Sequence, residues 1–252
     1  MTDWTTETAR AAVAALKRGA LSPHDLIDLT VARHGAVDGA VNALPTLCVE
    51  RARAQADRIL DGTHEGDRDH PGWLAGLPVV IKDLTDVAGA RTTYGSPAFA
   101  DHVAMRSDIM VETLEQRGAV VIAKSNTPEL RAGAQTFNEV FGKTRNPWNT
   151  ARTCGGSSGG SAVALATGQA WLATGSDLRG SLRIPAAFCS VVGLRPAPGR
   201  VARGPVADPM NDLSVEGPLG RTVGDVALLL DAMAGRHAGD PSALPRPATP
   251  FS

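Results

Sequence analysis

The chain has 252 residues, of which 43% are hydrophobic and 20% are charged, and its formal net charge is −1 at pH 7. This composition is typical of a soluble globular protein that forms one large domain or two small ones. The near-neutral charge gives no electrostatic reason to expect nucleic acid or an anionic membrane as a direct partner.

Targeting signals and cysteine spacing indicate the compartment. The opening residues, MTDWTTETAR, have neither the basic nor the apolar stretch of a secretory signal. No apolar run approaches the ~18 residues that a membrane span needs. Three cysteines, Cys48, Cys154 and Cys189, lack metal-type spacing, which favours reduced thiols. We therefore expect a cytoplasmic protein with no membrane partner.

Three helices are predicted in the N-terminal part of the chain from the spacing of small and apolar residues. They cover residues 6–20, residues 22 to about 33, and residues 48–60. Ser22, Pro23 and Asp25 supply an N-cap, a first-turn proline and an acidic third position for the second helix. A polar loop over residues 61–72 separates these helices from the next part.

Apolar strands and helices then alternate. Short apolar runs at residues 77–83 and 119–124 predict buried strands, and residues 108–117 between them predict a helix. A late helix is expected over residues 225–235, followed by a Pro-rich connection over residues 239–252. A strand–helix–strand pattern is typical of a sheet covered on both faces, so the predicted fold class is α/β.

A loop rich in glycine and serine, CGGSSGGSAVALA at residues 154–166, leads directly into an apolar run. A flexible linker does not fit, because residues 162–172 are apolar enough to be buried. A phosphate-binding loop does not fit, because Ser161 and Ala162 stand where its lysine and hydroxyl residue belong. The loop is better suited to present a serine, since the unpaired amides of a helix N-terminus favour developing negative charge.

A second loop with glycine and serine, GSDLRGS, occupies residues 175–181. A helix of about ten residues after the first loop rises ~15 Å. About five extended residues then return ~17 Å, so the lengths predict that Ser181 comes back beside Ser157.

These motifs resemble the amidase signature family, whose members carry a Gly-Gly-Ser-Ser-Gly-Gly loop, a helix, and an Asp-x-Gly-Gly-Ser loop followed by Arg and Pro. The matching segments here are GGSSGG at 155–160, DLRGS at 177–181, RNPWN at 145–149, AAFCSVVGLRP at 186–196 and GLPVVIKD at 76–83. The resemblance implies a mixed central β-sheet sandwiched by helices. Residues 1–240 would be the N-terminal portion of that domain, and 241–252 a Pro-rich loop or truncated end.

The resemblance also implies the catalytic residues. Ser181 resembles the nucleophile, Ser157 the bridging serine that follows a cis peptide bond, and Lys82 the base. A serine hydroxyl is a weak nucleophile until a base takes its proton. Burial in an apolar strand lowers the pKa of a lysine, as a neutral base requires. The alternative for Lys82 is a salt bridge with Asp83.

Supporting groups are implied in the same way. The backbone amides that resemble the oxyanion hole belong to Leu178, Arg179, Gly180 and Ser181. The supporting side chains are those of Ser158, Ser176 and Asp177. Helix capping is the alternative role for Ser158, and a hydroxyl bonded to the backbone is the alternative for Ser176.

Two departures from the family pattern bear on activity. Arg179 stands where the family has glycine, and if this position requires a positive φ, the arginine adds strain of ~1–2 kcal/mol. A lost oxyanion donor costs ~3 kcal/mol of transition-state stabilisation, so we expect the chain to be nearly inactive on amides. Relatives also continue further, which predicts an uncovered apolar sheet edge and a tendency to form homo-oligomers.

The sequence thus predicts an amidase that hydrolyses a small-molecule amide through an acyl-enzyme and releases ammonia or an amine. No metal or organic cofactor is implied, because the sequence contains no ligand cluster or dinucleotide fingerprint. Two alternatives stay open. One is a catalytically silent truncated homologue, and the other is a glutaminase-type subunit of a tRNA amidotransferase that needs partner subunits.

Overall fold

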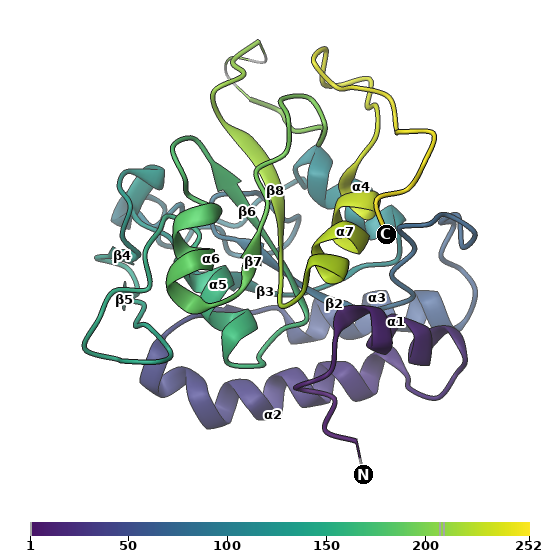
Figure 1. The fold of residues 1–252 in the computed structure, drawn as a ribbon, viewed down its shortest axis with the longest axis horizontal. Coiled ribbons are helices and arrows are strands. Elements are labelled where there is room, and N and C mark those ends of the chain that lie inside the picture. Colours follow the sequence, from purple (N-terminus) through teal and green to yellow (C-terminus); the bar gives the residue numbers. More distant parts are fainter. Residues whose placement is uncertain (1, 207, 209) are drawn as a thin grey trace.

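A central six-stranded sheet organises the fold (Figure 1). The computed structural model describes residues 2–206, 208 and 210–252. The strands are β1 (Thr46–Leu47), β2 (Pro78–Lys82), β3 (Val120–Ser125), β6 (Leu172–Asp177), β7 (Val192–Gly193) and β8 (Val215–Gly220), and a separate hairpin joins β4 (Phe137–Asn138) and β5 (Gly142–Lys143). Their order in the sheet is β1-β3-β2-β6-β8-β7. β2 runs parallel to β3 and β6, and the other pairings are antiparallel, so the sheet is mixed.

Helices cover both faces of this sheet. They are α1 (Ala9–Lys17), α2 (Pro23–Val41), α3 (Val49–Leu60), α4 (Ile109–Gln116), α5 (Gly159–Ala166), α6 (Arg183–Cys189) and α7 (Val223–Met233), with short 3-10 turns η1 (Pro97–Phe99) and η2 (Glu129–Arg131). One apolar core includes residues of α1, α4 and α7, and a second includes residues of α3, α5 and α6. The long helix α2 contributes Leu26 to the first core and Ile27 to the second. This arrangement confirms the predicted α/β class with a mixed central sheet.

The pleat of β2 decides where its last side chain points. All five residues of β2 are buried, because helices lie on both sides. Val79 and Ile81 pack into the first core and Val80 packs into the second, as the period of two in a strand requires. Lys82 comes two residues after Val80, so it lies on the face that α5 covers.

The helix α2 begins as predicted and ends later. The Ser22 hydroxyl accepts a hydrogen bond from the Asp25 amide, and the Asp25 carboxylate accepts one from the Ser22 amide. The helix continues past the predicted end near Arg33 to Val41, and it is capped by Asn42 in the left-handed conformation. Two glycines lie in this extension, but a helical glycine costs only about 1 kcal/mol relative to alanine, which does not end a packed helix.

The other predicted elements, α1, α3, β2, α4, β3 and α7, lie where the sequence placed them, within a few residues at each end. The sequence patterns did not predict α6, β1, β4, β5, β7 or β8. No described helix is both long enough and apolar enough to cross a membrane. The three cysteines carry free thiols.

Candidate active site

The buried amine of Lys82 lies at the centre of the site, at the C-terminal end of β2. Its side chain is 0% exposed. The Lys82 Nζ donates hydrogen bonds to Ser157 Oγ at 2.6 Å, to Ser158 Oγ at 3.0 Å and to Ser176 Oγ at 3.1 Å. The amine is therefore surrounded by hydroxyl oxygens that come from the start of α5 and the end of β6.

Burial lowers the pKa of Lys82 to about 7. The Glu216 carboxylate opposes this change by favouring the ammonium form, and the positive charge of Arg131 adds to it. Asp83, the next residue in the chain, forms its ion pair with Lys124 at 3.2 Å. The alternative in which Lys82 pairs with Asp83 is therefore wrong, because strand alternation sends the two side chains to opposite faces.

Two serine loops meet beside this amine. Ser157 follows the cis peptide bond Gly156–Ser157, and its side chain is buried. The Ser158 amide donates a hydrogen bond to the Ser181 carbonyl at 3.2 Å, which joins the two loops through their backbones. Ser181 is half-buried, and among the described residues no hydrogen bond links its hydroxyl to that of Ser157.

Ser158 occupies the N-cap position of α5, but its hydroxyl makes no capping hydrogen bond. The hydroxyl accepts from Lys82 Nζ and donates to the Ser176 carbonyl at 3.3 Å. The capping role that we considered for this side chain is therefore wrong, because the hydroxyl forms its hydrogen bond with the buried amine of Lys82 instead. The Ser176 hydroxyl likewise contacts Lys82 rather than serving only the backbone.

Asp177 fixes the shape of the loop that follows β6. Its carboxylate accepts hydrogen bonds from the Gly180 amide at 2.7 Å and the Leu182 amide at 3.2 Å. It also forms ion pairs with Arg183 at 3.0 Å and Arg195 at 3.3 Å. Burial alone would raise the pKa of Asp177, but the Arg183 guanidinium and the two amides outweigh it and lower the pKa to about 2. The carboxylate therefore remains charged in all but strongly acidic solution.

The backbone strain anticipated at Arg179 does not occur. The left-handed φ of this loop, +104°, falls at Gly180, and Arg179 is not among the residues with positive φ. The Arg179 side chain is exposed. The turn is made at the neighbouring glycine, so the arginine adopts an ordinary backbone conformation.

The four backbone amides predicted for the oxyanion hole differ in their partners. The Gly180 amide donates to the Asp177 carboxylate. The amides of Leu178, Arg179 and Ser181 donate to no acceptor among the described residues. Three of the four N–H groups are therefore free to bind an oxygen atom of a ligand.

The sequence analysis missed one charged residue of this region, Glu216 of β8. Glu216 is the strand partner of Ser176, whose hydroxyl contacts Lys82. Its segment, SVEGPLG, contains two glycines and a proline, which disfavour a strand prediction. No local signal in the sequence marks this residue, because its position follows from the pairing of β8 with β6.

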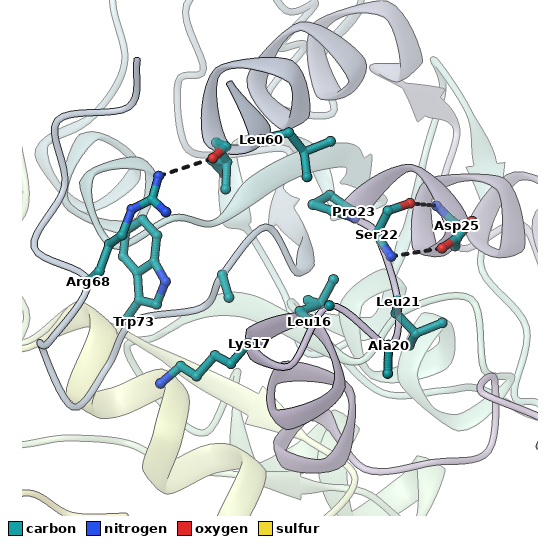
Figure 2. Close-up of a pocket in the computed structure, with 13 residues that line it drawn as sticks. Leu16, Lys17, Ala20, Leu21, Ser22, Pro23, Asp25, Leu60, Arg68 and Trp73 are labelled. Atoms are coloured by element: carbon teal, nitrogen blue, oxygen red, sulfur yellow. Dashed lines mark hydrogen bonds between the residues drawn. The ribbon is translucent and has the colours of Figure 1, made fainter. Parts of the chain in front are cut away.

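A hollow of about 570 Å³ lies away from this site, between the end of α1, the start of α2 and Trp73 (Figure 2). Arg68 lies over the Trp73 ring and donates to the Ile59 carbonyl at 3.1 Å. Ser22 and Asp25 line this hollow and are engaged in the capping box of α2. The polar side chains of Arg68, Ser22 and Asp25 are thus used in local structure. In the described part of the chain, no group of three or more His, Cys, Asp or Glu side chains is placed to hold a metal ion.

Comparison with known proteins gives consistent matches. The family model described as Amidase matches residues 25–252. A glutamyl-tRNA(Gln) amidotransferase subunit from Prochlorococcus marinus (strain MIT 9303) is 42% identical over 229 residues, which are 91% of this chain and 47% of that protein. The chain spans about half the length of the curated relatives it matches.

Solved structures agree with this match. A 6-aminohexanoate cyclic dimer hydrolase complexed with substrate superposes with a TM-score of 0.87 at 32% identity, over 99% of this chain and 50% of that chain. A bacterial aryl acylamidase of the amidase signature family superposes with a TM-score of 0.86 at 31% identity, over 95% of this chain and 50% of that chain.

Proposed function

Because the chain belongs to the amidase family, we propose that Lys82, Ser157 and Ser181 hydrolyse a small-molecule amide. One observation carries this proposal. A fully buried lysine amine lies 2.6 Å from the Ser157 hydroxyl and is surrounded by hydroxyl groups rather than by a carboxylate partner. Such an amine can exist in the neutral form and accept a proton.

The reaction begins with proton transfer along this relay. Neutral Lys82 takes a proton from Ser157, and Ser157 takes one from Ser181. The Ser181 oxygen attacks the amide carbon, and the free amides of Leu178, Arg179 and Ser181 stabilise the oxygen that becomes negative. The relay requires the Ser181 hydroxyl to turn toward Ser157, and the half-buried position of Ser181 leaves its side chain room to rotate.

The acyl-enzyme forms when the carbon–nitrogen bond breaks. The leaving nitrogen takes up the proton from the relay and departs as ammonia or an amine. Water then adds to the Ser181 ester, the carboxylic acid leaves, and the Ser181 hydroxyl is restored. No step requires a metal ion or an organic cofactor.

The test is release of ammonia from a panel of primary amides that includes propionamide, benzamide and glutamine. Ser181→Ala and Lys82→Met should each lower the rate by about 10³-fold or more, because the nucleophile or its base is lost. Ser125→Ala is the matched control, since this buried hydroxyl bonds to Ser161 Oγ at 2.7 Å and, among the described residues, makes no hydrogen bond to Lys82 or Ser181.

A second measurement traps the intermediate. An activated ester, p-nitrophenyl acetate, should add one acetyl group to the chain, and peptide mass spectrometry should locate it on Ser181. Turnover that survives in Ser181→Ala, or acetylation elsewhere in the active wild-type chain, would contradict the proposal. A chain that neither turns over amides nor takes up acetyl would instead support the silent homologue.

A glutaminase-type subunit is the second candidate. It is favoured by the similarity to the glutamyl-tRNA(Gln) amidotransferase of Prochlorococcus marinus. If this candidate is correct, glutamine should be hydrolysed faster than propionamide, and added partner subunits should raise the rate. Equal rates on both amides with no response to partners would exclude it.

A further inference from the structure

A cavity of about 230 Å³ lies beside β8. Its lining includes Glu216, the strand partner of Ser176. The lining residues that matter here are Asp86, Tyr94, Asp108, Arg131, Arg203 and Glu216. The volume corresponds to about eight water molecules at ~30 Å³ each, so the cavity can take a group of about four to six heavy atoms.

Glu216 is the least satisfied group in this lining. Its side chain is only 6% exposed. The Glu216 Oε2 atom is buried and accepts no hydrogen bond from any described residue. A buried acceptor without a partner is rare in native proteins, because the group has lost its hydration and gained nothing in return.

Four of the other charged groups of the lining have partners. Arg203 donates to the Asn211 carbonyl, and the fifth group, Arg106, has an exposed side chain. Asp108 accepts two backbone N–H groups, at 2.8 Å and 3.1 Å, and Asp86 accepts the Tyr94 hydroxyl at 2.6 Å. Arg131 donates to Ser214 Oγ at 3.2 Å. Glu216 therefore stands apart as a carboxylate aimed into a cavity with no donor bonded to it.

The charges around Glu216 act on it only from a distance. Burial raises the pKa of Glu216, and the positive charges of Arg131, Lys82 and Arg203 lower it without offsetting the burial. The neighbouring Asp108 adds negative charge to the same cavity, and its own pKa is raised by burial and by Glu216. A cation in direct contact would supply the hydrogen bonds and the counter-charge that the Glu216 carboxylate lacks.

We propose that this cavity is a binding subsite for a protonated amine, whose ammonium group donates hydrogen bonds to Glu216. Because Glu216 is paired across the sheet with Ser176, an amine held there lies beside the Lys82 site. The proposal concerns binding and does not depend on amide hydrolysis.

The experiment measures binding of n-butylammonium to the full chain at about pH 8 by isothermal titration calorimetry. Wild type should bind the probe saturably, and Glu216→Gln should bind it at least about tenfold more weakly, because a charge-assisted hydrogen bond becomes a neutral one. Glu65→Gln is the matched control, since Glu65 lies on an exposed loop, and it should bind like wild type.

Two further probes and one spectroscopic readout make the result decisive. n-Butanol, which lacks the charge, and butyrate, which carries the opposite charge, should both bind more weakly than n-butylammonium. In ¹³C-labelled wild type, the Glu216 carboxyl resonance should shift on titration with n-butylammonium, and this measurement needs no variant. Tighter binding of butyrate than of n-butylammonium would mean that the arginines of the lining dominate binding, and it would overturn the proposal. Absence of saturable binding, or equal binding by Glu216→Gln, would overturn it as well.

Discussion

Two fully buried lysines on neighbouring strands, Lys82 on β2 and Lys124 on β3, show how partners set the chemistry of a buried amine. Lys124 Nζ pairs with the Asp83 carboxylate at 3.2 Å and donates to Thr92 Oγ1 at 2.7 Å. Lys82 Nζ donates to three serine hydroxyls. Lys124 has a counter-charge in contact, whereas Lys82 has none among the described residues.

The sheet separates the two amines by placing them on opposite faces. A register irregularity between β2 and β3 makes Lys124 the strand partner of Ile81 and makes Lys82 the partner of Ser125. Ile81 belongs to the core that includes α1, α4 and α7. The Ser125 hydroxyl bonds to Ser161 of α5, on the other face. The irregularity therefore lets one strand pair carry an ion-paired lysine and a lysine bonded to serine hydroxyls on opposite faces.

Burial lowers the pKa of both lysines, but the opposing influences differ. At Lys124 the Asp83 carboxylate resists the change through its charge and its hydrogen bond. At Lys82 the resisting carboxylates, Glu216 and Asp177, are not in contact. We conclude that a carboxylate in contact favours the charged form of a buried lysine, whereas a shell of hydroxyls opposes the effect of burial less strongly.

The largest expected effect comes from removing the counter-charge of Lys124. Asp83→Asn should lower the free energy of unfolding by about 3–5 kcal/mol, because it leaves a buried ammonium uncompensated. Urea denaturation at about pH 7 measures this change. The control is Asp28→Asn, which breaks an exposed ion pair with Arg53 and should cost less than about 1 kcal/mol. Equal losses in the two variants would remove the distinction between the lysines.

The pH dependence of stability isolates Lys82. In the folded chain the pKa of Lys82 is about 7, below its ordinary value of 10.5, so the unfolded chain binds more protons between these values and stability rises with pH. Lys82→Met should remove a rise of about 2–3 kcal/mol between pH 7 and pH 9. Denaturation curves of both chains across this range measure the difference, in which the shared contribution of Lys124 cancels. Parallel curves would mean that Lys82 keeps its proton in the folded chain.

The smallest expected effect compares single hydroxyls next to each amine. Thr92→Val should cost about 1–2 kcal/mol, because the charged Lys124 loses an acceptor that nothing replaces. Ser158→Ala should cost about 1 kcal/mol or less, because Lys82 keeps two other hydroxyls. Thermal melts show which of the two variants loses more stability. A larger loss of stability in Ser158→Ala than in Thr92→Val would contradict our interpretation.

Local patterns in the sequence were sufficient for much of this arrangement. The apolar run of residues 77–83 predicts β2 because a strand between two helical layers is apolar on both faces. The Gly-rich loop predicts the start of α5, and the alternation of β2 then points Lys82 toward it. The residues of the proposed relay come from such local signals together with the family resemblance.

Features that depend on pairing between distant segments could not be predicted. The register irregularity between β2 and β3 leaves no mark in either strand, and it alone decides which face Lys124 takes. The position of Glu216 depends on antiparallel pairing of β8 with β6 across 40 residues of chain, from Ser176 to Glu216. The conformation of Arg179 depends on the carboxylate of Asp177, which fixes the turn through amides further along the loop.

The hydrogen bonds that the Asp177 carboxylate accepts from the Gly180 and Leu182 amides have an evolutionary consequence. The loop is held through the amides of residues 180 and 182, and the exposed side chain of residue 179 makes no hydrogen bond to Asp177. Selection for the shape of the loop therefore acts on Asp177 and Gly180 and leaves position 179 open to drift. The arginine found there keeps an ordinary backbone conformation and adds a positive charge to the exposed surface of the loop. Lineages can acquire new preferences for charged substrates at such a position without remodelling the fold.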